Sequence, residues 1–223
     1  MKKRIYLFIA FVVLIGFQNE IYAQKGLSEG KVIYTITYPD MEMDPQMVAM
    51  MPTESVVFFK GAMSRTDLSM GMGISSSSIM NSKTGEIVAL TDMMGSKSAM
   101  KMTTDELKKS KNQNKTPDPV ITITNETKEI AGYKCKKAIV KNADNTQEIY
   151  YTDEINSISA ATLDWKEIKG FPMEYSIDQN GLKMKFAAKS VTPEKVADTI
   201  FVIPADYKMV TQEEMMKKMT GGE

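Results

Sequence analysis

The strongest constraint on the fold is a period of two in hydrophobicity, which recurs in short runs along the chain. Over residues 31–38, apolar and aromatic side chains occupy every second position, the pattern of a β-strand with one buried face. Residues 97–102 alternate in the same way. Further short runs, separated by turn-forming residues, predict strands at 56–60, which is apolar on both faces, at 63–70, which has mixed faces, and at 74–80, 86–91, 120–124, 133–141, 148–152 and 199–202. We therefore expect a mainly β domain built on an antiparallel sheet.

A hairpin centred on Asn180 and Gly181 is the clearest local signal, because both residues suit the positive φ angles of a type I′ turn. The cross-strand pairs expected from this turn are Met173 with Ala188, Tyr175 with Phe186, Ile177 with Met184 and Asp178 with Lys183.

Short helices are expected at three points. Asp44 followed by Pro45 is typical of a helix start. The T-x-x-E spacing of a capping box occurs at Thr103 and Glu106 and again at Thr211 and Glu214.

The first 23 residues are predicted to be a secretory signal peptide. Lys2, Lys3 and Arg4 precede an apolar run at 5–17, which is too short to span a bilayer, and Ala23 supplies the small residue before the cut. An uncleaved amino-terminal anchor is the alternative. Cleavage after Ala23 would leave residues 24–223 as a single domain in the periplasm or outside the cell.

The composition excludes several classes of function. The chain has no histidine, so it cannot build a Ser-His-Asp triad, a Cys-His pair or a histidine-ligated zinc site. With 28 basic and 28 acidic residues, it lacks the basic surplus typical of nucleic-acid binding. Its single cysteine, Cys135, rules out an internal disulfide and is read as a buried apolar residue, with a reactive or intermolecular thiol as the alternative. No cofactor and no enzymatic activity are expected.

Methionine is the compositional anomaly, with 20 residues in the chain. Its unbranched, polarisable side chain suits an adaptable apolar surface. Thioethers also bind Cu(I), and Met100 with Met102 is one of the pairs close enough in sequence to act together. Both interpretations remain open from the sequence.

Several short motifs resemble a secreted bacterial family, domain of unknown function 4412, and the related GLPGLI group. The motifs are the Gly-Tyr-Lys-Cys-Lys-Lys stretch at 132–137, the opening at 30–34, the turn at 58–61 and the closing segment 201–204. This resemblance implies a fold like that of the periplasmic lipoprotein carriers: a curved antiparallel sheet forming an incomplete barrel, with a few short helices covering its concave face. It implies no catalytic residue.

The leading hypothesis is a non-enzymatic domain that binds an acyl chain or lipid between sheet and helices. The residues expected to line this site are Val57, Phe59, Met100, Met102, Tyr175, Met184 and Phe186. Cu(I) binding by the methionines and a structural or interaction module of the cell envelope, with an envelope protein as partner, are the alternatives.

Overall fold

The computed structural model describes residues 26–41, 44–106, 119–142, 146–157, 165, 167–179 and 181–214. Its strands are β1 (Glu29–Thr37), β2 (Glu54–Lys60), β3 (Met63–Met70), β4 (Ile74–Asn81), β5 (Glu86–Met93), β6 (Ser96–Thr103), β7 (Val120–Ile130), β8 (Tyr133–Lys141), β9 (Thr146–Thr152), β10 (Phe171–Gln179), β11 (Leu182–Thr192) and β12 (Lys208–Met209). The labelled helical segments are α1 (Pro45–Met50) and η2 (Asp198–Phe201), which is a short 3₁₀ helix.

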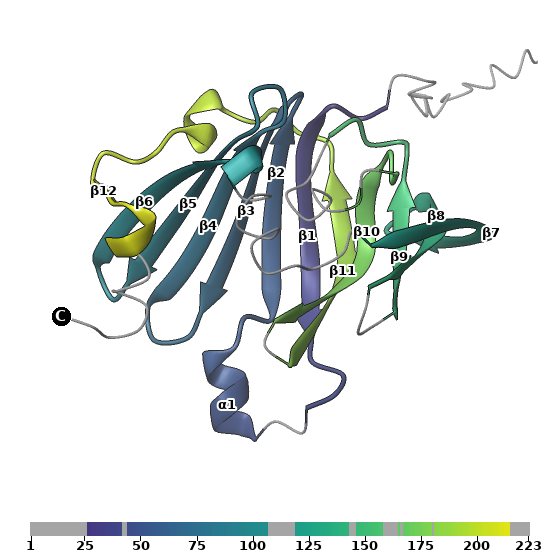
Figure 1. Ribbon diagram of the computed structural model, residues 1–223, viewed down its shortest axis with the longest axis horizontal. Helices are drawn as coiled ribbons and strands as arrows, with labels where there is room; N and C mark the ends of the chain where they lie inside the picture. Colours follow the sequence, from purple (N-terminus) through teal and green to yellow (C-terminus); the bar gives the residue numbers. More distant parts are fainter. Residues whose placement is uncertain are drawn as a thin grey trace, which may run out of the picture.

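All twelve strands belong to one open sheet in the order β12-β6-β5-β4-β3-β2-β1-β11-β10-β9-β8-β7. Neighbouring strands are antiparallel, except that β12 runs parallel to β6. β11 returns beside β1 and thereby joins the two halves of the sheet, which curves across the molecule (Figure 1). The predicted fold class, a mainly β protein with an open, curved sheet, is confirmed.

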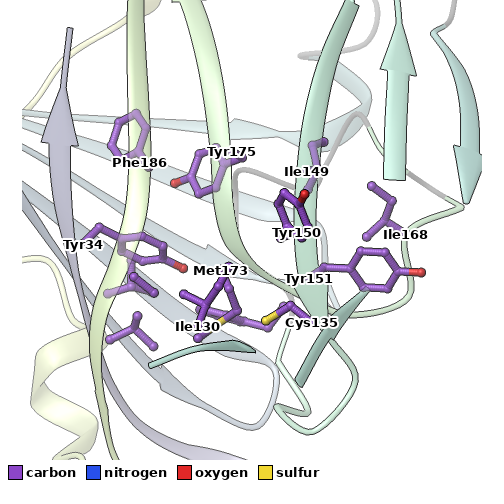
Figure 2. Packing of buried hydrophobic residues seen from close by; sticks show 14 of the residues in the cluster. Tyr34, Ile130, Cys135, Ile149, Tyr150, Tyr151, Ile168, Met173, Tyr175 and Phe186 are labelled. Atoms are coloured by element: carbon purple, nitrogen blue, oxygen red, sulfur yellow. The ribbon is translucent and has the colours of Figure 1, made fainter. Parts of the chain in front are cut away.

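The main hydrophobic core lies on β1, β2 and β8–β11. Tyr175 stacks on Phe186 with ring centroids 5.0 Å apart, and its ring meets Tyr34 edge-on at 5.9 Å. The Tyr34 hydroxyl donates a 2.6 Å hydrogen bond to the Pro172 carbonyl oxygen, so the buried polar atom has a partner. Figure 2 shows this aromatic group beside Met173 and Cys135.

Burial of Cys135 is also confirmed. The side chain is fully buried, and its Sγ donates a weak hydrogen bond to the Tyr133 carbonyl oxygen at 3.4 Å. Loss of solvation raises the pKa of the thiol to about 11, so it is protonated at neutral pH.

Several local predictions are confirmed by the structure. The β10–β11 ladder pairs Tyr175 with Phe186, Ile177 with Met184 and Asp178 with Lys183, as the turn residues indicated. In both capping boxes the glutamate accepts a 2.7 Å bond from the backbone N–H of the threonine and the threonine hydroxyl accepts one from the glutamate N–H. The helix predicted after Asp44 is α1.

The strand predicted at 199–202 is wrong. Residues 198–201 form η2, outside the sheet ladders, and the backbone carbonyl of Ile200 accepts a hydrogen bond from Arg65 instead of from a neighbouring strand. The predicted signal peptide, residues 1–23, lies outside the described residues.

Candidate functional site

One face of the sheet over β3–β6 is distinguished by its side chains. Residues paired across an antiparallel ladder lie on the same face, and the ladders from β3 to β6 therefore define four rows. The rows are Met70, Ile74, Met93 and Ser96; Leu68, Ser76, Thr91 and Ser98; Thr66, Ser78, Ala89 and Met100; and Ser64, Met80, Ile87 and Met102. We call this surface the methionine face.

None of the residues in these rows is charged. All six charged residues of β3–β6 lie on the opposite face: Arg65, Asp67, Glu86, Asp92, Lys97 and Lys101. Charge is therefore completely segregated between the two faces of this half of the sheet.

The charged face is covered by the segment that follows β11, residues 193–210, which we call the C-terminal segment. Its side chains Phe201, Ile203 and Tyr207 pack against a second hydrophobic cluster formed by Ile79, Val88, Leu90 and Ala99. Because these four residues lie on the charged face, the C-terminal segment does not account for burial on the methionine face.

Polar anchors hold the C-terminal segment in place. Arg65 pairs with Asp67 at 2.7 Å and donates to the Ile200 carbonyl oxygen at 3.0 Å. Lys97 Nζ lies 2.6 Å from the Asp206 carboxylate, and this hydrogen-bonded pair raises the pKa of the lysine and lowers that of the aspartate. Arg65 and Lys97 of the charged face thus bind the C-terminal segment directly.

Burial on the methionine face is uneven. Met80 and Ile87 are 1% and 6% exposed, yet neither belongs to either of the two hydrophobic clusters found among the described residues. Met70, Met93, Met100 and Met102 are partly exposed. This face combines thioethers, aliphatic groups and hydroxyls in a half-buried setting without a charge.

The seven predicted site residues all lie on the same side of the sheet, because the ladders connect Val57 and Phe59 to the methionine face on one side and to the β1, β11 and β10 residues on the other. They do not form one group. Val57, Phe59, Tyr175 and Phe186 are buried in the main core, with Met184 packed against it, whereas Met100 and Met102 lie on the methionine face.

Sequence reasoning missed the segregation of charge. The signal was present, because the loop lengths at 71–73, 82–85 and 94–95 together fix which positions of β3–β6 share a face. The alternation within a single strand does not reveal this pattern, which requires the register of all three hairpins.

Among the described residues, no group of three or more histidine, cysteine, aspartate or glutamate side chains could hold a metal ion. The helices of the described part of the chain are also too short or too polar to cross a membrane.

A family model described as the N-terminal domain of N-glycanase peptide matches residues 65–211, which is more than half of the chain. The match begins within β3 and includes β4–β6 and the C-terminal segment. These comparisons give no support to the resemblance to domain of unknown function 4412 or to the GLPGLI group, and they do not confirm a likeness to lipoprotein carriers. No curated protein matches the chain.

Among solved structures, two crystal forms of PNGF-II are similar to the chain. Each is 16% identical in sequence, with TM-scores of 0.52 and 0.53, and the matches cover 86% and 85% of this chain. The chain spans about a third of the length of PNGF-II, since 32% of that protein is covered. An uncharacterized conserved protein from Thermus thermophilus matches with a TM-score of 0.46 and 9% identity, over 83% of this chain and 92% of that one. At these identities the structural likeness concerns the fold alone.

Proposed function

The chain belongs to the family of N-glycanase peptide N-terminal domains, and from this premise we propose that it is a non-catalytic binding domain whose methionine face holds an apolar ligand such as an acyl chain. One observation carries the proposal: the side chains of β3–β6 segregate into an uncharged face and a charged face that the C-terminal segment covers.

An uncharged face suits an apolar ligand because binding desolvates no ionised group. Each methylene group of a ligand transferred from water to such a surface contributes about 0.8 kcal/mol. The hydroxyls of Ser76 and Thr91, in the row next to Met70, Ile74 and Met93, add hydrogen-bonding groups of the kind that an ester or amide of a lipid can use.

Methionine favours a flexible chain over a rigid ligand. Its three rotatable bonds let it follow differently shaped apolar partners at little cost. Met93, Met100 and Met102 lie on β5 and β6, share this face and are partly exposed, so an extended chain lying across these two strands would contact their thioethers.

The family match concerns an amino-terminal domain, and PNGF-II is about three times as long as the part that this chain covers. The activity of the longer protein is therefore not transferred to this chain.

We also propose that residues 24–223 act as one domain in the periplasm or outside the cell after cleavage following Ala23, which amino-terminal sequencing of exported protein would test.

The test of ligand binding is organic extraction of protein purified under non-denaturing conditions, followed by lipid mass spectrometry, with copper measured on the same sample. We expect lipid in stoichiometric amounts. The double variant Met100→Gln/Met102→Gln keeps the length of both side chains while making them polar, and it should lose most of the lipid.

Met209→Gln is the matched control, because Met209 is 48% exposed and belongs to β12, outside the methionine face. It should retain lipid as the unaltered protein does. Bound copper without lipid would instead support a Cu(I) site, and protein free of both would leave a structural or interaction role.

A further inference from the structure

Four exposed methionines lie at one end of the methionine face. Met47 and Met50 belong to α1, Met72 lies in the turn between β3 and β4, and Met94 lies in the turn between β5 and β6. Their exposed fractions are 39%, 55%, 66% and 73%. We call these four residues the methionine rim.

The segments that carry the rim are joined by backbone hydrogen bonds. The Gly71 N–H donates to the Met50 carbonyl oxygen at 3.4 Å, and the Met94 N–H donates to the Gly73 carbonyl oxygen at 3.2 Å. A Cβ at Gly71 would collide with the Ala49 carbonyl oxygen, so α1 lies directly against the first turn. Figure 1 shows α1 projecting beyond the end of the sheet.

Both turns contradict the usual choice of residue. Met72 and Met94 have φ angles of 62° and 53° and are each followed by a glycine with positive φ, the arrangement of a type I′ turn. Asparagine, aspartate or glycine normally occupies that first position, because an ordinary L-residue is disfavoured in the left-handed region. Two neighbouring turns therefore place exposed methionine where the backbone favours another residue.

Ala131, in the turn between β7 and β8, provides an internal comparison. It also has a positive φ, 51°, but it packs against the main core. Met72 and Met94 belong to neither hydrophobic cluster of the described residues and are mostly exposed. Core packing thus accounts for a non-glycine residue with positive φ at Ala131 but not at Met72 or Met94. A local departure from the preferred residue without a packing gain is typical of functional sites.

The four rim methionines are uncharged, and the two carboxylates that flank them in sequence, Asp44 and Asp92, accept hydrogen bonds from backbone N–H groups of α1 and of the second turn. Residues 45–53, 69–77 and 93–96 contain no aspartate, glutamate, lysine or arginine. Lys97, just beyond the second turn, pairs with Asp206 at 2.6 Å and lies 3.9 Å from Asp92. The rim therefore offers apolar contact without an electrostatic attraction to an anionic partner.

We propose that the methionine rim inserts into the apolar layer of a lipid bilayer. A bilayer accepts protruding, flexible apolar groups without a complementary shape, whereas a protein interface of useful affinity includes a polar edge with several hydrogen bonds. The four rim side chains are uncharged and are carried by two turn tips and a short projecting helix, which fits a bilayer better than a protein partner.

The rim is continuous with the methionine face. The row Met70, Ile74 and Met93 directly adjoins the two turns. A chain leaving the bilayer at the rim would therefore meet this face first. This entry route rests on the proposed function, whereas insertion of the rim does not.

Vesicle flotation of the mature chain tests the proposal. We expect the protein to float with vesicles of phosphatidylcholine alone and equally with vesicles that also contain phosphatidylglycerol, with little dependence on salt. The double variant Met72→Asn/Met94→Asn should bind the vesicles at least about tenfold more weakly, because two apolar side chains are lost from the contact. Its thermal midpoint should be unchanged or higher, since asparagine suits both turns.

The matched control is Val120→Thr/Ile123→Thr, which removes two similarly exposed apolar side chains from β7 at the far edge of the sheet. It should float like the unaltered protein. Met100→Gln/Met102→Gln should also float like the unaltered protein, although we expect it to lose extractable lipid. The two assays therefore distinguish failure of rim insertion from failure of ligand binding.

Three results would overturn the proposal. Absence of flotation with both vesicles, including a case in which the rim mediates self-association, would exclude a bilayer partner. Flotation only with anionic lipid and only at low salt would assign binding to lysines. Undiminished flotation of Met72→Asn/Met94→Asn would show that the two methionines do not carry the binding. A lower thermal midpoint together with undiminished flotation would give them a role in folding.

Discussion

The thiol of Cys135 should be nearly inert in the folded protein. Thiol reagents attack the thiolate, whose fraction depends on the pKa. With the pKa raised from 9.0 to about 11, about 0.1% of the thiol is ionised at pH 8, against about 10% in the unfolded chain. The native rate at pH 8 should therefore be at least about a hundredfold lower, and complete burial of the side chain lowers it further.

The same pKa shift makes stability depend on pH. Because burial raises the folded pKa, the neutral thiol stabilises the native state fully below pH 9, and this contribution is lost as pH rises through about 11. The loss is about 1 kcal/mol at pH 10 and approaches about 3 kcal/mol above pH 11, because each pKa unit corresponds to about 1.4 kcal/mol.

Two assays measure these effects. The rate of reaction with dithionitrobenzoate at pH 8 is compared in native buffer and in urea. The free energy of unfolding of the protein is compared with that of Cys135→Ala from pH 8 to pH 11, so that the titration of tyrosines and lysines cancels. A native rate within tenfold of the unfolded rate, or a difference that does not change with pH, would refute the reasoning.

Two further predictions concern the two faces of β3–β6. Met80→Ala should lower the free energy of unfolding by about 2–4 kcal/mol in urea titrations, because the side chain is 1% exposed; a loss below about 1 kcal/mol would show that it is poorly packed. Phe201→Ala should lower it by about 2 kcal/mol and accelerate proteolysis within residues 193–210, because the ring packs on the second cluster; unchanged proteolysis would mean that the polar anchors alone hold the C-terminal segment.

Local signals in the sequence predicted much of the fold because they depend on nearby residues. The turn at Asn180 and Gly181 determines the register of β10 and β11, and the threonine and glutamate of each capping box lie three residues apart. Alternation within a strand is equally local. These features survive in the structure because packing does not oppose them.

Non-local contacts account for the failures. Residues 199–202 form a short run rich in β-branched and aromatic residues, but the segment lies outside the sheet ladders, where Arg65 and Lys60 hydrogen-bond to the backbone and side chains around η2. The side chains of Phe201 and Ile203 pack on strands more than 100 residues earlier in the chain. No window of sequence contains that information.

The candidate site was only partly predictable for the same reason. Phe59 and Phe186 are large apolar residues of predicted strands, and the structure buries both in the main core. Met100 and Met102 share one face of an alternating strand, but they belong to the half of the sheet whose uncharged face depends on the register of three successive hairpins. Face assignment therefore requires the ladders and cannot be made from each strand alone.

The distribution of charge indicates why methionine is concentrated in this half of the molecule. Arg65 and Lys97 reach the C-terminal segment through long side chains, so these two residues are needed on the charged face. Leucine or valine would fill the methionine face more rigidly, because branched side chains have fewer rotamers. The methionine rim is exposed and the methionine face is half-buried, yet both contain methionine and they adjoin at Met70, Ile74 and Met93. A requirement for adaptable apolar contact accounts for both, whereas a requirement for core packing alone would not place Met72 and Met94 in left-handed turns facing solvent.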